Sequence, residues 1–138
     1  MKKIFLASLL TIFTLGIASA QNTASNDKAQ AENQNGPKIE FSSTTHDYGD
    51  IKKGGDGNCE FTFTNVGNEP LILSNVRASC GCTTPSYTKE PVMPGKTGKI
   101  KVRYNTNNLG GFSKRVTVNS NSTTNPTVTL TIKGTVKQ

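Results

Sequence analysis

The sequence has no tryptophan, only 3 cysteines and a single histidine, and its 9 acidic residues are outnumbered by 16 lysines and arginines. A structural zinc site takes four ligands, so a zinc site of this kind would need all three cysteines and the histidine together. No nucleophile motif accompanies His46, and the carboxylates are dispersed through turns and outward-facing positions, so neither a catalytic triad nor a glycosidase pair has support. We therefore predict no catalytic residues and no enzyme.

The chain also lacks a second hydrophobic run after its N-terminus, and spanning a bilayer takes about 20 apolar residues. The one long uncharged stretch, residues 4–17, follows Lys2 and Lys3 and precedes the small residues 18–20. This order is typical of a secretory signal peptide. We expect residues 1–20 to be removed, and the mature protein, without a transmembrane segment, to be periplasmic or secreted.

Residues 21–36, QNTASNDKAQAENQNG, contain no large apolar side chain. Such a segment cannot bury enough surface to offset its conformational entropy, and it predicts a disordered tether. The folded domain is then expected over residues 37–138.

Within that domain, apolar residues alternate with polar ones, and turn residues interrupt the alternation every ten or so positions. Gly49 predicts a kink inside one strand, and no segment has the period of a capped helix. An all-β, single immunoglobulin-like sandwich of about seven strands is predicted. The expected strands are 39–41, 48–51, 59–64, 71–78, 99–104, 112–119 and 127–133.

Lysine and arginine are scattered singly among threonine and asparagine. A nucleic-acid-binding protein would gather them on one element, so no nucleic-acid partner is predicted. A solvated basic surface is the simplest interpretation, and weak attraction to an anionic membrane or an acidic glycan remains open.

The segment Cys80-Gly81-Cys82 is the strongest candidate for chemistry. A bond between the two sulfur atoms would close a small, strained and easily reduced ring, which suggests redox exchange. Two thiolates also suit a soft ion, and copper, which accepts two ligands, fits better than zinc. In the third alternative, Cys59 forms a structural disulfide with Cys80 or Cys82 at one end of the sandwich, and the odd thiol stays unpaired.

Two further features are weaker candidates. His46 is expected to pack beside Tyr48 and not to act in catalysis. Leu109 and Phe112 lie in a loop rich in Asn and Gly, which indicates either a binding loop or two side chains tucked over the end of the core.

Three motifs resemble a known family: HDYGDI at 46–51, NVGNEPL at 65–71 and ASCGCTTP at 78–85. The chain resembles an exported bacterial immunoglobulin-like family that is common in Bacteroidetes and known as domain of unknown function 1573. The middle motif is also similar to the sandwich domains of hydin and major sperm protein. His46 stands where the family usually has Phe, and Cys59 is an addition. The resemblance implies a fold, a compartment and a source, but no activity.

Two functional hypotheses follow. The first is a non-catalytic exported module that contacts an unknown protein or envelope component, with its oligomeric state open. The second is a redox or copper site at Cys80 and Cys82.

Overall fold

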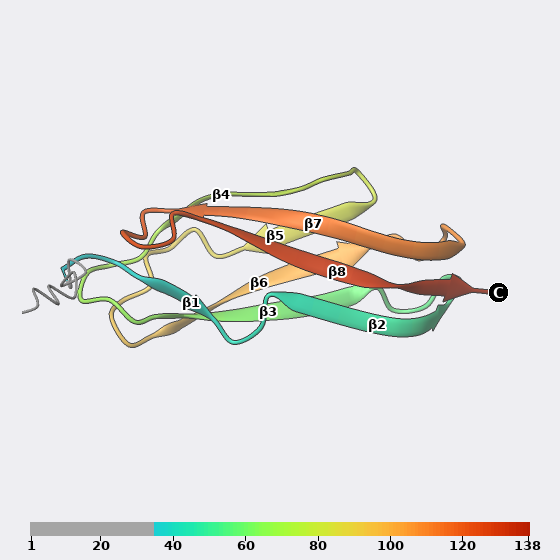
Figure 1. Ribbon diagram of the computed structural model, residues 1–138, viewed down its shortest axis with the longest axis horizontal. Coiled ribbons are helices and arrows are strands. Elements are labelled where there is room, and N and C mark those ends of the chain that lie inside the picture. The colour runs from blue at the N-terminus through green and yellow to red at the C-terminus, as the bar shows by residue number, and fades with distance from the viewer. Residues whose placement is uncertain (1–34) are drawn as a thin grey trace, which may run out of the picture. The chain divides into compact units, whose positions relative to one another are not determined.

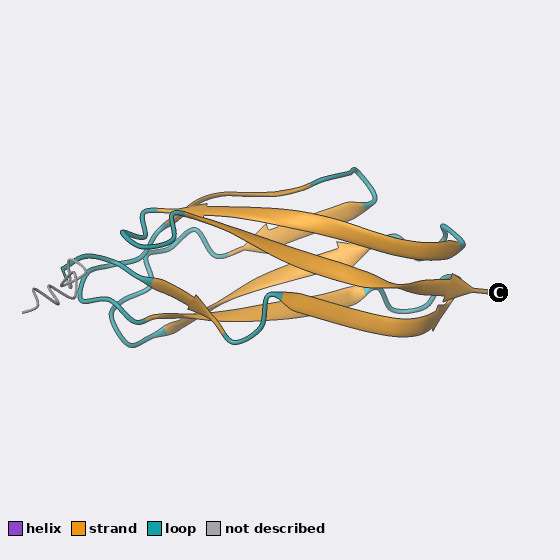
Figure 2. Cartoon of the chain, viewed as in Figure 1, coloured by secondary structure: helices purple, strands orange, loops and turns teal. Residues whose placement is uncertain are grey.

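The computed structural model describes residues 35–138 and contains only strands and loops in that range (Figure 2). The predicted signal peptide and residues 21–34 of the predicted tether lie outside the described residues. No helix in the described part is long and apolar enough to span a membrane. The strands are β1 (Ile39–Phe41), β2 (Thr45–Lys52), β3 (Asn58–Asn65), β4 (Leu73–Ala78), β5 (Thr83–Tyr87), β6 (Thr97–Tyr104), β7 (Gly110–Ser120) and β8 (Thr127–Lys137).

The strands form two four-stranded sheets packed face to face (Figure 1). The first sheet has the order β1-β3-β6-β5 and the second has the order β2-β8-β7-β4. All neighbours are antiparallel except β2 and β8, which run parallel. The predicted immunoglobulin-like sandwich is confirmed.

Alternating side chains of both sheets fill the space between them, as the period-two pattern predicts. Phe63 of β3 is 1% exposed and Ile100 of β6 is 0% exposed, and both face the second sheet. The fully buried side chains on that sheet are Val116, Val118, Leu130 and Ile132. Burying each of these aliphatic side chains contributes about 1.5–3 kcal/mol relative to leaving it in water.

The structure differs from the sequence expectations at β4 and β5. The segment predicted as a strand at 71–78 forms β4 only from Leu73, and β4 pairs with β7 in the second sheet, whereas 59–64 lies in the first. Before β4, the chain passes from the first sheet to the second, and in this passage Leu71 forms an isolated bridge with Val92. The extra strand β5 was not predicted, because its sequence TTPSY lacks alternating apolar residues and contains a proline.

Aromatic rings close one end of the core, which we call the Tyr104 end. The rings of Tyr104 and Phe112 stack with centroids 3.8 Å apart, and Tyr48 lies 5.8 Å from Phe112. Gly134 makes room for this cluster, since a Cβ there would lie 3.0 Å from the Cβ of Tyr48. The strand β8 runs through Gly134 and ends at Lys137, four residues past the predicted end at residue 133.

Candidate functional site

The Cys80-Gly81-Cys82 loop lies where the chain crosses from β4 in one sheet to β5 in the other. The sulfur atoms of Cys80 and Cys82 are joined in a disulfide, with the two Cα atoms 5.3 Å apart. Before the loop, the Ser79 amide donates to the Arg115 carbonyl at 2.8 Å; after it, the Asn105 amide donates to the Cys82 carbonyl at 2.8 Å. The backbone on each side of the disulfide is thus fixed to a different sheet.

The hydroxyl of Thr83 faces both sulfur atoms. Its Oγ1 lies 3.8 Å from Cys80 Sγ and 3.9 Å from Cys82 Sγ, and Thr83 is 4% exposed. A disulfide sulfur carries no hydrogen, so the hydroxyl is the donor and shares its single hydrogen between the two sulfur atoms. Sulfur therefore supplies the side-chain hydrogen-bond partners of this buried hydroxyl.

A hollow of about 350 Å³ opens beside Cys82 but is not lined by Cys80. Its other walls carry polar or charged side chains, including those of Thr84, Arg103 and Asn105. Cys80 and Cys82 are both partly exposed, and Gly81 is exposed. The hollow therefore places a polar molecule beside Cys82 and not beside Cys80.

Cys59 does not take part in this site. It pairs with Val102 of β6, and β6 separates β3 from β5. Strands two positions apart in a sheet are separated by about 9–10 Å, which exceeds the reach of a disulfide. The structure therefore has no bond from Cys59 to Cys80 or Cys82. Burial raises the pKa of the Cys59 thiol, an effect that a contact with the Tyr48 hydroxyl partly offsets.

The copper role of Cys80 and Cys82 stays a prediction. Across residues 35–138, no group of three or more His, Cys, Asp or Glu side chains gathers where a metal ion would bind. A disulfide offers no thiolate ligand, so the pair would have to be reduced before it held Cu(I).

The remaining predicted residues lie around the Tyr104 end. His46 packs edge-on against Tyr48 with ring centroids 4.5 Å apart, as expected. Phe112 is part of the aromatic cluster, whereas Leu109 is 49% exposed. The predicted binding loop thus has one side chain on the core and one in solvent.

β6 carries a basic row, although the lysines and arginines were predicted to be scattered over the surface. Lys99, Lys101 and Arg103 alternate with core residues, so they share the outer face of the first sheet. Lys99 pairs with Glu60 at 2.8 Å, and Arg103 reaches the hollow beside Cys82. The signal was present in the period-two spacing of the three cations.

An open backbone edge on β7 was also missed. β8 pairs with β7 from Gly110 onward, but β4 pairs only with the half that begins at Val116. Figure 1 shows β7 continuing beyond the turn that follows β4. The N–H and C=O groups of Arg115 both point toward Ser79, on the side away from β8. Every second residue of a strand points its backbone groups to the same side, so the N–H and C=O groups of Gly111 and Ser113 also point away from β8, where no strand covers them.

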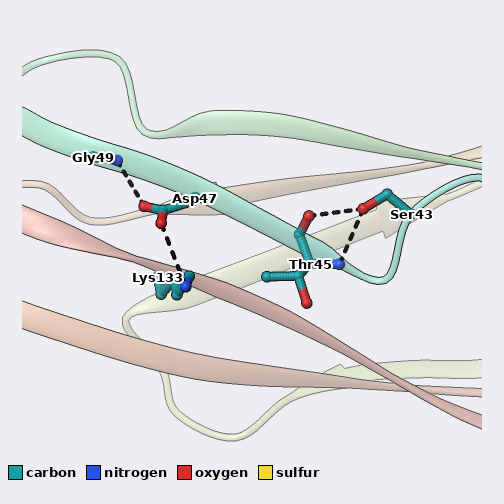
Figure 3. A network of polar contacts seen from close by, with 5 residues as sticks. All are labelled: Ser43, Thr45, Asp47, Gly49 and Lys133. Atoms are coloured by element: carbon teal, nitrogen blue, oxygen red, sulfur yellow. Dashed lines mark hydrogen bonds and ion pairs between the residues drawn. The ribbon is translucent and has the colours of Figure 1, made fainter.

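Three of the four outer strands, β1, β2 and β5, carry features that discourage pairing, in contrast to this half of β7. β1 has only three residues, and β5 contains Pro85. β2 is interrupted by a register shift at Gly49, whose φ is 60°. Asp47 fixes this bulge by accepting from the Gly49 amide at 2.8 Å and pairing with Lys133 at 3.4 Å (Figure 3). Short strands, proline and bulges are common protections of sheet edges.

The Gly49 amide also holds the pKa of Asp47 below its usual value. Asp47 therefore stays ionised in the bulge to lower pH than a free carboxyl would. Nearby, the Ser43 hydroxyl donates to the Thr45 carbonyl at 2.9 Å and accepts from its amide (Figure 3). These local bonds shape the start of β2.

Solved structures of low sequence identity share the fold. A protein of unknown function from Porphyromonas gingivalis W83 is 18% identical with a TM-score of 0.65, covering 74% of this chain and 48% of that one. The ASH/PapD-like domain 7 of human CEP192 is 10% identical with a TM-score of 0.61, covering 73% and 86%. The CsuC–CsuE chaperone–tip adhesion subunit pre-assembly complex of Acinetobacter baumannii is 11% identical with a TM-score of 0.54, covering 72% and 57%.

This chain thus spans about half the length of the P. gingivalis protein. No curated protein matches it. An immunoglobulin-like sandwich without an established activity fits a non-catalytic module. The model of a family described as "protein of unknown function (DUF1573)" matches residues 39–136, and the chain therefore belongs to that family.

Proposed function

We propose that this chain is an exported, non-catalytic module that binds an extended segment of another protein along the open edge of β7. The observation that carries the proposal is the uncovered backbone of Gly111 and Ser113. An unpaired strand edge can hydrogen-bond an added strand, which is a common mode of peptide recognition. In sandwich proteins such edges are usually shortened, bulged or covered; here β1 is short and β2 is bulged.

The surroundings of the edge suggest the chemistry of the partner. Lys114 is half-buried, and its side chain lies on the same inward face of β7 as those of Phe112 and Val116. An added strand that places a carboxylate opposite Lys114 would offset the cost of covering this cation. The exposed Leu109 offers an apolar contact beside the start of the strand. The expected partner segment is therefore extended and carries an acidic residue near an apolar one.

Two observations support export. The order of charged, apolar and small residues over 1–20 is typical of a signal peptide, and the disulfide between Cys80 and Cys82 is of a kind that persists in oxidising compartments. Fractionation of the producing cell and N-terminal sequencing of the purified chain test this part. A chain that keeps Met1 in the cytoplasm would contradict it.

Binding at the edge is tested with a pair of variants at one position. Ser113→Pro removes the amide hydrogen that faces the open edge, while the ladder to β8 does not use that hydrogen. Ser113→Ala keeps the amide and is the matched control. A photoreactive residue at 113 identifies the partner by crosslinking, and the same residue at 129, on the outer face of β8, is the positional control.

The partner segment found by crosslinking is then made as a peptide and titrated against both variants. We expect the proline variant to bind at least about tenfold more weakly than the alanine variant, because a backbone hydrogen bond is lost and the strands no longer fit. Circular dichroism checks that both variants fold. Equal affinities, or equal crosslinking at positions 113 and 129, would exclude the edge as the binding site.

A further inference from the structure

We infer that the disulfide between Cys80 and Cys82 is a thiol–disulfide exchange site, in which an incoming thiol attacks Cys82 from the hollow and Thr83 stabilises the thiolate released at Cys80. This inference goes beyond the binding role of β7 and does not depend on it. The expected reaction partner is a dithiol, either a peptide or a small molecule.

The hollow distinguishes the two cysteines, although both are partly exposed and Cys82 also packs against the core. The hollow of about 350 Å³ is lined by Cys82 and not by Cys80, so a thiol that enters it meets Cys82 first. Thiol–disulfide exchange requires the thiolate to reach one sulfur of the bond. Arg103 also lines this hollow, and its positive charge favours an anionic reactant over a neutral one.

Thr83 provides the second feature of the site. It is 4% exposed, and its hydroxyl lies within 4 Å of both sulfur atoms. Such a buried donor gains most when its acceptor becomes charged, because hydrogen bonds to ionised groups are stronger than neutral ones. When the bond to Cys82 breaks, Cys80 becomes a thiolate that this hydroxyl can stabilise without a rearrangement of the backbone.

The backbone keeps the two cysteines together after reduction. The hydrogen bond from Ser79 to β7 and the bond to the Cys82 carbonyl from Asn105 do not depend on the disulfide. The two Cα atoms, 5.3 Å apart, therefore stay within the range that a disulfide needs. The reduced loop remains able to form the bond again.

The atoms and electrons of the exchange balance between this chain and the dithiol. The thiolate of the first partner cysteine attacks Cys82 Sγ, forming a mixed disulfide as the bond between Cys80 and Cys82 breaks, and its electron pair remains on Cys80. The second partner thiolate then attacks the partner's sulfur in the mixed disulfide and releases Cys82 as a thiolate. The two protons lost by the partner thiols end on Cys80 and Cys82. The partner is oxidised by two electrons and this chain is reduced by two.

The test uses the purified oxidised chain and reduced glutathione, with mixed disulfides trapped by alkylation and located by mass spectrometry. We expect glutathione on Cys82 and an alkylated thiol on Cys80. Glutathione mainly on Cys80, or a reaction no faster than that of the disulfide in a short peptide with the sequence 79–84, would overturn the inference.

Variants of Thr83 test its role separately. Thr83→Val keeps the shape and removes the hydroxyl, and we expect reduction by glutathione to be about tenfold slower. Thr83→Ser restores the hydroxyl and should recover most of the rate, whereas Thr129→Val, on the outer face of β8, should leave it unchanged. Equal rates for the valine and serine variants would overturn the role of Thr83. If the valine variant does not fold, the cysteine to which glutathione attaches in the unmodified chain still tests the inferred exchange site.

Arg103 is tested by changing the charge of the reactant. Arg103→Gln should slow reduction by the anionic glutathione several-fold and leave reduction by the neutral 2-mercaptoethanol nearly unchanged. Lys99→Gln removes a charge from the same strand face outside the hollow, so it serves as the control. A similar effect of both variants on both thiols would show that the hollow does not guide the incoming thiol.

Discussion

The side-chain amide of Asn65 donates a hydrogen bond of 2.8 Å to the carbonyl of Val92, a residue 27 positions later in the chain. The same amide nitrogen donates to the Glu69 carbonyl at 2.7 Å, and its oxygen accepts from the Gly67 amide at 3.0 Å. Asn65 is 0% exposed. One buried side chain thus connects the end of β3, the loop after it and the segment before β6.

Asn65→Ala is expected to destabilise the fold strongly. The substitution removes the hydrogen bonds of a buried side chain. The Val92 carbonyl keeps its bond from the Leu71 amide at 2.9 Å, but the Glu69 carbonyl and the Gly67 amide lose these partners, and each polar group left unsatisfied costs about 1–3 kcal/mol. We expect a loss of about 3 kcal/mol or more in urea unfolding. Asn108→Ala, at an exposed loop position, is the control and should stay within about 0.5 kcal/mol of the unchanged protein. A loss below about 1 kcal/mol for Asn65→Ala would contradict this role.

Gly98 allows Phe63 to fill the core. A Cβ on Gly98 would overlap the Phe63 ring, which is 1% exposed. Overpacking of this kind costs about 1–3 kcal/mol, so Gly98→Ala should lower the free energy of unfolding by that amount. Gly111→Ala is the matched control, because no atom lies within 4 Å of its Cβ position. Equal unfolding midpoints for the two variants would show that the ring can yield.

The sequence predicted the sandwich because burial on one face imposes a two-residue period on each strand. The alternation around Phe61 and Phe63 and the positions of the turns were enough to place most strands. It did not reveal β5, whose residues carry little apolar surface, or the sheet to which β4 belongs. Strand pairing depends on contacts between segments far apart in the chain, and Leu71 meets Val92 only after folding.

The candidate site was predicted only in part, for a similar reason. Spacing alone allowed Cys80 to bond either Cys82 or Cys59, and the intervening strand β6 decides between them. The contact of Thr83 with the sulfur atoms depends on the turn within the loop. The open half of β7 arises because β4 leaves its partner early, and no local pattern around Ser113 indicates that departure.

Stability at alkaline pH should depend on Cys59. Burial raises the pKa of this thiol above its usual value, so the folded chain keeps the proton at a pH where the unfolded chain loses it. The contribution of Cys59 is therefore fully present below the unfolded pKa of about 8.5 and is lost as the pH rises from there through the folded value.

Urea unfolding from about pH 7 to pH 9.5 measures this effect. The Cys80→Ser/Cys82→Ser double variant is the suitable background, because it prevents disulfide exchange with Cys59 in the unfolded chain. Adding Cys59→Ser to that background should flatten the decline above about pH 8.5. Burial also raises the pKa of Tyr48, but tyrosine titrates above this range. Parallel pH profiles with and without Cys59 would exclude the thiol as the cause.

Reduction of the disulfide between Cys80 and Cys82 should destabilise the fold only slightly. A disulfide stabilises mainly by restricting the unfolded chain, and the effect grows with the length of the closed loop. Here a single residue separates the cysteines, so the loop relation gives about 1–2 kcal/mol, against about 3 kcal/mol for a loop of 15 residues. Comparing oxidised and reduced forms of the Cys59→Ala variant in urea isolates this bond. A loss above about 3 kcal/mol would mean that the loop is mainly a structural clamp between the sheets, whereas a small loss leaves the bond available to open and close while the sandwich stays folded.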